Sequence, residues 1–162
     1  MRMGILHKCF GGCGFTSRNQ PSTTTMEYLG HRFSLDQLRK STDDFDKSRK
    51  IGLGPCGSMA YRGCISINGQ LKHVKVKRLG GDESGISPEG ISMYENDILF
   101  MCQLHHPNLV SYVGFCDDQN EKLLVYEYAP NGSLHQQLYG TESKPPTLSW
   151  KKRVEISIGV AR

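Results

Sequence analysis

The chain has 162 residues, of which 37% are hydrophobic, and its formal net charge at pH 7 is +4. This length supports one modest domain and a tail, but it is short for two lobes that share an interface. Because the small positive excess is not arranged as a basic stripe that alternates with aromatic residues, nucleic acid is excluded as an expected partner.

Residues 1–32 are predicted to form a disordered basic leader, because they combine Gly, Ser, Thr, Asn and Pro without apolar periodicity. Residues 1–40 hold six Lys or Arg against two acidic residues, whereas the remainder carries fourteen of each sign. The leader is expected either to be a solvated, flexible segment or to touch the inner membrane surface. Cys9 and Cys13 are candidates for palmitoylation, with an unmodified glycine-rich leader as the alternative.

The chain contains six cysteines but no CxxC pair, and its start does not resemble a secretory signal. Reduced, intracellular thiols are therefore expected rather than a disulfide framework, and no zinc site is predicted. No apolar run approaches the roughly 18 to 20 residues that are needed to cross a bilayer.

The first ordered segment is predicted over residues 33–47 as a lead-in helix, with helical turns through about Thr42, because Ser34 and Gln37 form a capping-box pattern. Strands are predicted over 49–52, 59–67 and 71–79, with a turn at residues 68–69 between the last two. In the third strand, alternation directs Val74 and Val76 to a core face and Lys75 and Lys77 to the opposite face.

A regulatory helix is predicted to begin after Ser87, which is followed by a proline and a glutamate. Its apolar side is expected to consist of residues at helical spacing, namely Ile91, Tyr94, Ile98, Met101 and His105. Two further strands are predicted over 110–116 and 122–128, then a short helix over 133–139, a loop over 141–147 and a final helix from Trp150 onward.

Four motifs occur in a fixed order along the chain. They are Gly52-Leu53-Gly54-Pro55-Cys56-Gly57, Val74-Lys75-Val76-Lys77, residues 104–110 (LHHPNLV) and residues 124–134 (LVYEYAPNGSL). From Phe33 to Arg162 the chain resembles the kinase domain of plant receptor-like protein kinases, closest to the FERONIA-like malectin-receptor group.

The resemblance implies an α+β fold: a kinase N-terminal lobe with a five-stranded antiparallel sheet and a regulatory helix, preceded by the disordered tail. Residues 48–128 would form this lobe, and residues 129–162 the hinge and the first helices of a C-terminal lobe. The family's His-Arg-Asp catalytic loop and Asp-Phe-Gly metal site are expected beyond Arg162, so no catalytic or metal-binding residue is assigned.

The resemblance also implies a nucleotide-binding site for ATP. Lys77 would bind the phosphates and pair with Asp97 of the regulatory helix, because Glu95, two residues away, faces elsewhere. The whole expected set is Ile51, Gly52, Gly54, Gly57, Met59, Lys77, Asp97, Tyr126, Glu127, Tyr128 and Ala129.

Several positions depart from the family pattern. Pro55 removes a backbone donor from the glycine loop, and Cys56 stands where an aromatic residue is usual. Asp97 replaces a longer glutamate, so we expect either a longer ion pair or a helix that lies closer to the strand. Lys75 occupies the place of a small alanine that packs on adenine, and its ammonium would lie in the adenine slot. ATP binding is therefore expected to be weak, with Mg²⁺ only if a C-terminal lobe exists.

Three readings of function follow. The first is a truncated or pseudokinase-like lobe without phosphotransfer, which acts as a binding or decoy module. Its partners would be other receptor-like kinases or their substrates, in the cytoplasm at the inner face of the plasma membrane. The second is the beginning of an active Ser/Thr kinase in signal transduction whose gene model is incomplete. The third is a fragment that does not fold stably by itself.

Overall fold

The computed structural model describes residues 29–80, 85–118, 120–139 and 148–161. These residues form two compact units, a sheet unit (29–105 and 111–128) and a helical unit (106–110 and 129–161). The elements in chain order are β1 (His31–Arg32), α1 (Leu35–Ser41), η2 (Lys47–Arg49), β2 (Lys50–Leu53), η3 (Pro55–Gly57), β3 (Met59–Ile67), β4 (Gln70–Leu79), α2 (Pro88–Met101), β5 (Tyr112–Asp117), β6 (Lys122–Glu127), α3 (Leu134–Tyr139) and α4 (Trp150–Ala161).

The sheet confirms the expected α+β architecture but has six strands, in the order β1-β5-β6-β4-β3-β2. The five predicted strands pair antiparallel, and the unpredicted β1 pairs in parallel with β5 at one edge. This close pairing requires Gly114, because a Cβ there would lie 1.9 Å from the carbonyl oxygen of His31. The structure therefore corrects the expectation of a five-stranded, wholly antiparallel sheet.

Order begins before Phe33, since His31 and Arg32 of the predicted leader belong to β1. The Phe33 N–H extends the pairing by donating to the carbonyl of Phe115 over 2.8 Å. The partner strand is more than eighty residues away in sequence, so local composition does not reveal it. Cys9 and Cys13 lie outside the described residues.

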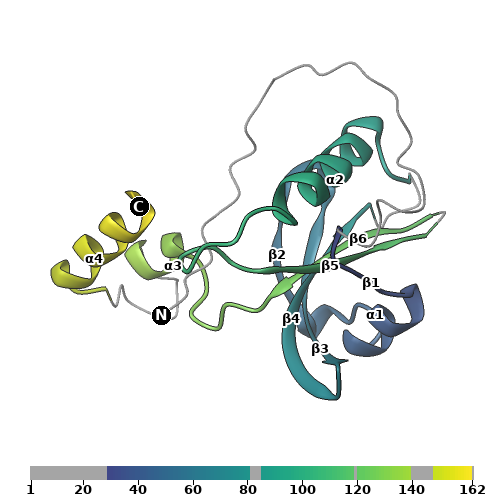
Figure 1. Cartoon of the computed structure of the whole chain (residues 1–162), viewed down its shortest axis with the longest axis horizontal. Coiled ribbons are helices and arrows are strands. Elements are labelled where there is room, and N and C mark those ends of the chain that lie inside the picture. The colour runs from purple at the N-terminus through teal and green to yellow at the C-terminus, as the bar shows by residue number, and fades with distance from the viewer. Residues whose placement is uncertain (1–28, 81–84, 119, 140–147, 162) are drawn as a thin grey trace. The chain divides into compact units, whose positions relative to one another are not determined.

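Helices α1 and α2 lie on opposite faces of the sheet (Figure 1). On the α1 face, aliphatic and aromatic side chains from α1 and four strands form one cluster. Its buried members are Phe33, Leu38, Phe45, Tyr61, Ile65, Val74, Val76, Cys116, Leu123 and Val125. Burial of this apolar surface holds the lead-in segment against the sheet.

Helix α1 begins at the predicted capping box, in which the Ser34 hydroxyl accepts from the Gln37 N–H and the Gln37 side chain accepts from the Ser34 N–H. It ends at Ser41, within one residue of the helix end expected at about Thr42, so the rest of the 33–47 lead-in segment is not α-helical. The reason is a left-handed turn, because Asp43, Asp44 and Phe45 have φ of 51°, 54° and 57°.

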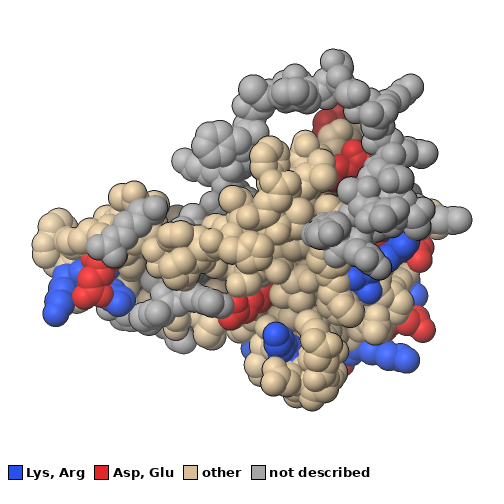
Figure 2. Space-filling view, viewed as in Figure 1, with Lys and Arg blue, Asp and Glu red and all other residues tan. Residues whose placement is uncertain are grey.

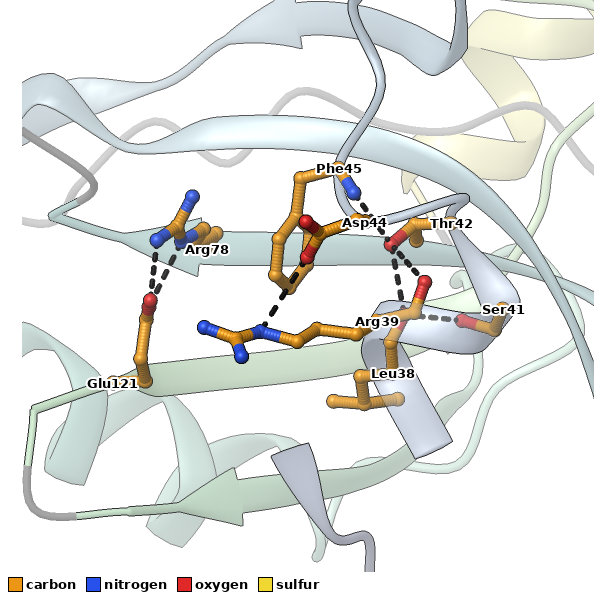
Figure 3. A network of polar contacts seen from close by, with 8 residues as sticks. All are labelled: Leu38, Arg39, Ser41, Thr42, Asp44, Phe45, Arg78 and Glu121. Carbon is orange, nitrogen blue, oxygen red and sulfur yellow. Dashed lines mark hydrogen bonds and ion pairs between the residues drawn. The ribbon is translucent and has the colours of Figure 1, made fainter. Parts of the chain in front are cut away.

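The Thr42 hydroxyl holds this turn together, as Figure 3 shows. It donates to the Leu38 carbonyl over 2.7 Å and accepts from the Phe45 N–H over 3.2 Å. Thr42 is completely buried, so the Phe45 N–H depends on this hydroxyl rather than on water, whereas the Leu38 carbonyl also accepts from the Ser41 hydroxyl over 2.8 Å.

The ring of Phe45, which belongs to this turn, packs against the Arg78 side chain of the Arg78–Glu121 ion pair (Figure 3). The Arg78 guanidinium is 4.6 Å from the ring centroid. It donates two hydrogen bonds to Glu121, one of them from Nε over 2.8 Å. These contacts tie the turn after α1 to β4 and to the residue that precedes β6.

Helix α2 begins as predicted, with the Ser87 hydroxyl accepting from the Gly90 N–H over 3.1 Å. Its buried side consists of Gly90, Tyr94, Ile98 and Met101. Two members of the predicted apolar side are wrong: Ile91 is exposed, and His105 lies beyond the last residue of the helix and is exposed. Gly90 is buried instead, and a Cβ there would lie 3.0 Å from the Ile86 side chain and 3.5 Å from the Ser87 hydroxyl, so the segment before the helix covers this position.

The helical unit contains α3 and α4, and the Asn108 side chain donates to the Gly159 carbonyl over 2.8 Å. None of the described residues of α4 is buried. Trp150, Val154 and Ile158 of its predicted apolar side are all exposed, and Figure 2 shows charged side chains of both signs over this helix. No helix in the described ranges is long and apolar enough to cross a membrane.

We expect Thr42→Val to lower the free energy of unfolding by about 1–3 kcal/mol, because it leaves the buried Phe45 N–H and Leu38 carbonyl without the hydroxyl. Thr42→Ser keeps the hydroxyl and serves as the matched control. Urea unfolding followed by circular dichroism measures the difference. Equal losses for the two variants would contradict the role given to the hydroxyl.

Candidate nucleotide-binding site

The site is built on β4, whose two faces have opposite chemistry. Val74 and Val76 are 1% and 0% exposed in the cluster on the α1 face. Lys75 and Lys77 alternate with them and therefore lie on the α2 face. This confirms the predicted division of the strand.

Lys77 forms the predicted ion pair with Asp97 of α2, and the Nζ–Oδ2 distance is 2.9 Å. The two side chains are only 13% and 18% exposed, so the pair is shielded from water. Of the two expectations, a longer pair is not found. The contact is short because Asp97 lies between the buried positions Tyr94 and Met101, at spacings that direct it toward the sheet. Glu95 is exposed, as predicted.

Lys75 has no ion pair among the described residues, although it is partly buried beside the Lys77–Asp97 pair. Its Nζ lies 6.0 Å from the centroid of the Tyr126 ring, which is directly opposite on β6. Burial lowers the pKa of Lys75, the charge of Lys77 lowers it further, and Asp97 opposes the shift. Within the described residues, the α2 face therefore carries a cation that has no ion-pair partner of its own.

The β3–β4 register corrects the assignment of Met59 to the nucleotide site. Met59 pairs with Arg78 and packs against the cluster on the α1 face. Ala60, which pairs with Lys77, lies on the α2 face instead. The site residue of this strand can be located from either of two motifs. Counting forward from the glycine loop selects Met59, whereas counting back from Tyr61-Arg62-Gly63 selects Ala60, because three residues separate Gly57 from Tyr61.

Gly52 lies in the same row as Ala60 and Lys77, since it pairs with Ala60 across β2 and β3. A Cβ built on Gly52 would meet nothing within 4 Å. Ile51 is exposed, at the irregular step in the β2–β3 pairing. The row beside Lys77 therefore begins with two small residues and open space.

The turn after Gly52 is closed by its own hydrogen bonds. The Gly54 N–H donates to the Ser58 carbonyl over 2.7 Å, and the Ser58 N–H donates to the Pro55 carbonyl over 3.1 Å. Because Pro55 has no N–H, the turn has two other backbone donors to offer an anion, at Cys56 and Gly57. Gly57 has φ of +71°, and Cys56 adopts the same left-handed region at 53°, which disfavours side chains.

The segment expected to contact a base begins at Tyr126, which is buried. The Glu127 N–H donates to the Ser111 carbonyl, and the Tyr128 N–H donates to the His73 carbonyl. Both donors are therefore occupied within the sheet unit, whereas Ala129 belongs to the helical unit. The nucleotide-binding roles of all these residues stay predictions. The described ranges contain no group of three or more His, Cys, Asp or Glu side chains that could hold a metal ion.

We expect Asp97→Ala to lower the free energy of unfolding by about 1–3 kcal/mol, because it leaves the shielded Lys77 ammonium without a counter-charge. Glu95→Ala, on the exposed side of the same helix, is the control and should change stability by about 0.5 kcal/mol or less. Urea unfolding of both variants checks the difference. Wild-type stability in Asp97→Ala would show that the pair is dispensable.

The sequence profile of the family described as protein tyrosine and serine/threonine kinase matches residues 45–162. A probable receptor-like protein kinase of Arabidopsis thaliana is 39% identical over 152 residues, covering 93% of this chain and 16% of the relative. A putative G-type lectin S-receptor-like serine/threonine-protein kinase of the same plant is 42% identical over 130 residues, covering 80% of this chain and 14% of the relative.

Among solved structures, that of an apo pseudokinase is similar, with a TM-score of 0.65 and 28% sequence identity over 82% of this chain and 49% of the other. The chain thus spans about a sixth of the length of these curated relatives. Since receptor-like kinases of differently named groups match about equally well, the similarity extends to receptor-like kinases in general rather than to the FERONIA-like group alone. With its α+β lobe, its Lys77–Asp97 pair and these matches, the chain belongs to the protein kinase family, with receptor-like protein kinases as its relatives.

Proposed function

We propose that the chain is a pseudokinase-like binding or decoy module. It keeps the residues of a kinase nucleotide lobe that would contact the phosphates, which we call the phosphate half. The residues that would contact adenine, which we call the base half, are degenerate. The 162 residues are proposed to have no phosphotransfer activity on their own. The observation that carries the proposal is the Lys75 ammonium, partly buried and without an ion pair among the described residues, on the face that adenine would contact.

The phosphates of ATP fit the residues present. Lys77 is held in place by Asp97, and Gly52, two strands away in the same row, has open space beside it. An ammonium that is positioned by an ion pair binds a phosphoryl oxygen without a further loss of side-chain freedom. Lys77 would therefore hold the phosphates, and the Cys56 and Gly57 N–H groups would supply backbone donors.

The adenine base does not fit the residues equally well. A base that stacks on β4 would displace water from Lys75, and neutral adenine offers the ammonium no counter-charge. The solved apo pseudokinase shows that this fold occurs in a protein described as a pseudokinase, which supports the proposal by analogy. ATP, when bound, supplies a transferable phosphoryl group, and Mg²⁺ would need ligands from a C-terminal lobe.

The alternative function is that of the N-terminal part of an active Ser/Thr kinase in signal transduction. The formed Lys77–Asp97 pair favours it, because an active kinase requires this contact between the third strand and the regulatory helix. An open reading frame past Arg162 that encodes His-Arg-Asp would support this alternative, and an immediate stop codon would remove it. Transfer of radioactive phosphate from ATP to a generic protein substrate by the 162-residue chain, lost in Lys77→Ala, would instead refute the proposed lack of phosphotransfer.

The proposed partners are other receptor-like kinases or their substrates, and the proposed setting is the cytoplasm at the inner face of the plasma membrane. The support is the similarity to receptor-like kinases over most of the chain.

We expect Lys75→Ala to raise the affinity for ATP by about tenfold or more. Bound adenine would displace the water that hydrates the Lys75 ammonium, and the substitution removes this cost. Lys77→Ala should lower the affinity, because it removes the cation assigned to the phosphates. Isothermal titration calorimetry measures both changes. Unchanged ATP affinity in Lys75→Ala would contradict the proposed defect in the base half.

A further inference from the structure

Three cations share one face of the β3–β4 hairpin. Arg62 lies directly opposite Lys75 in the register, and Lys77 follows Lys75 by two residues, so all three side chains leave the α2 face. Directly opposite residues in an antiparallel pair have Cβ atoms about 4.5–5.5 Å apart. We call Arg62, Lys75 and Lys77 the cationic strip.

The strip has less negative charge than positive charge. Asp97 pairs with Lys77, and no other ion pair involves the strip within the described residues. Glu127 pairs with Val74 in the register and therefore belongs to the other face of the sheet. Like charges that face each other across two strands destabilise the pairing. A bound anion would remove this repulsion, which favours occupancy of the strip by negative charge.

The strip is exposed at Arg62 and becomes more buried toward Lys77. Arg62 is exposed, Lys75 is partly buried, and the strand positions beside Lys77 continue through the buried Ala60 to Gly52, where an added Cβ would meet nothing within 4 Å. Lys77 is only 13% exposed, so a flat charged surface such as a membrane cannot reach it. A narrow, flexible anion with several charges in a line meets both requirements.

We propose that the cationic strip binds a linear polyphosphate of three or more phosphates, without requiring a base. The inference rests on the proposed function in one respect, the assignment of Lys77 to phosphate. Successive phosphates would face Lys77 and Lys75 along β4 and then Arg62 across the β3–β4 pair, so the bound chain would bend at Lys75 and place charge where the base half offers nothing to adenine. Lys75 is thereby a ligand for phosphate and a barrier to the base at once.

Calorimetric titration of the full 162-residue chain with inorganic tripolyphosphate tests the proposal, with inorganic phosphate, adenosine and ATP as comparison ligands. Tripolyphosphate should bind more tightly than phosphate or adenosine, and its affinity should fall as salt is added. Arg62→Ala and Lys75→Ala should each weaken tripolyphosphate binding by about tenfold. Lys72→Ala is the matched control, because Lys72 is an exposed lysine of β4 on the opposite face.

The effect of Lys75→Ala separates this proposal from the proposed function. Weaker binding of tripolyphosphate together with tighter binding of ATP supports both. Unchanged tripolyphosphate binding with tighter ATP binding overturns the strip and leaves the degenerate base half intact as an explanation. Equal weakening by Lys75→Ala, Arg62→Ala and Lys72→Ala means general attraction of an anion to a basic surface, which also overturns the strip. Far-ultraviolet circular dichroism confirms that each variant is folded before titration.

Discussion

The structure depends on β4 being covered on both faces by different chemistry. Val74 and Val76 are buried in the hydrophobic cluster on the α1 face, whereas Lys77 on the other face forms an ion pair with Asp97 of α2. A shift of one residue in the pairing of this strand would place lysines in the apolar cluster and valines beside the carboxylate. The free-energy cost of a buried, unpaired ammonium therefore fixes the register, and the register places Lys75 and Lys77 on the α2 face.

The lead-in segment is part of this arrangement rather than an appendage to it. Leu38 and Phe45 close the cluster over Val74 and Val76, and Thr42 shapes the turn between them. The Arg78–Glu121 pair joins the same turn to the sheet, and the neighbouring residue Lys77 faces the nucleotide side. The packing that holds α1 thus also holds β4 in the position in which Lys77 meets α2.

Within the site, the phosphate and base halves have diverged to different degrees. The shorter carboxylate of Asp97 still reaches Lys77, because the helix presents it on the buried side. Lys75, by contrast, introduces a charge that nothing in the described part of the sheet unit neutralises. The fold depends on the packing of the α1 face, whereas the proposed preference for a more anionic ligand depends on residues of the other face, so the two can change independently.

Local patterns in the sequence determined much of this protein. The alternation of Val74 to Lys77, the capping box at Ser34, the cap at Ser87 and the left-handed turn at Asn68 and Gly69 each involve residues close in sequence, so their physical causes can be read directly. The tertiary structure alone decided that β1 pairs with β5 and that Ala60, rather than Met59, lies beside Lys77. It also decided that Arg62 and Lys75 lie directly opposite each other. These features depend on the register between strands, which is set by the packing of the whole sheet and not by the residues on either side.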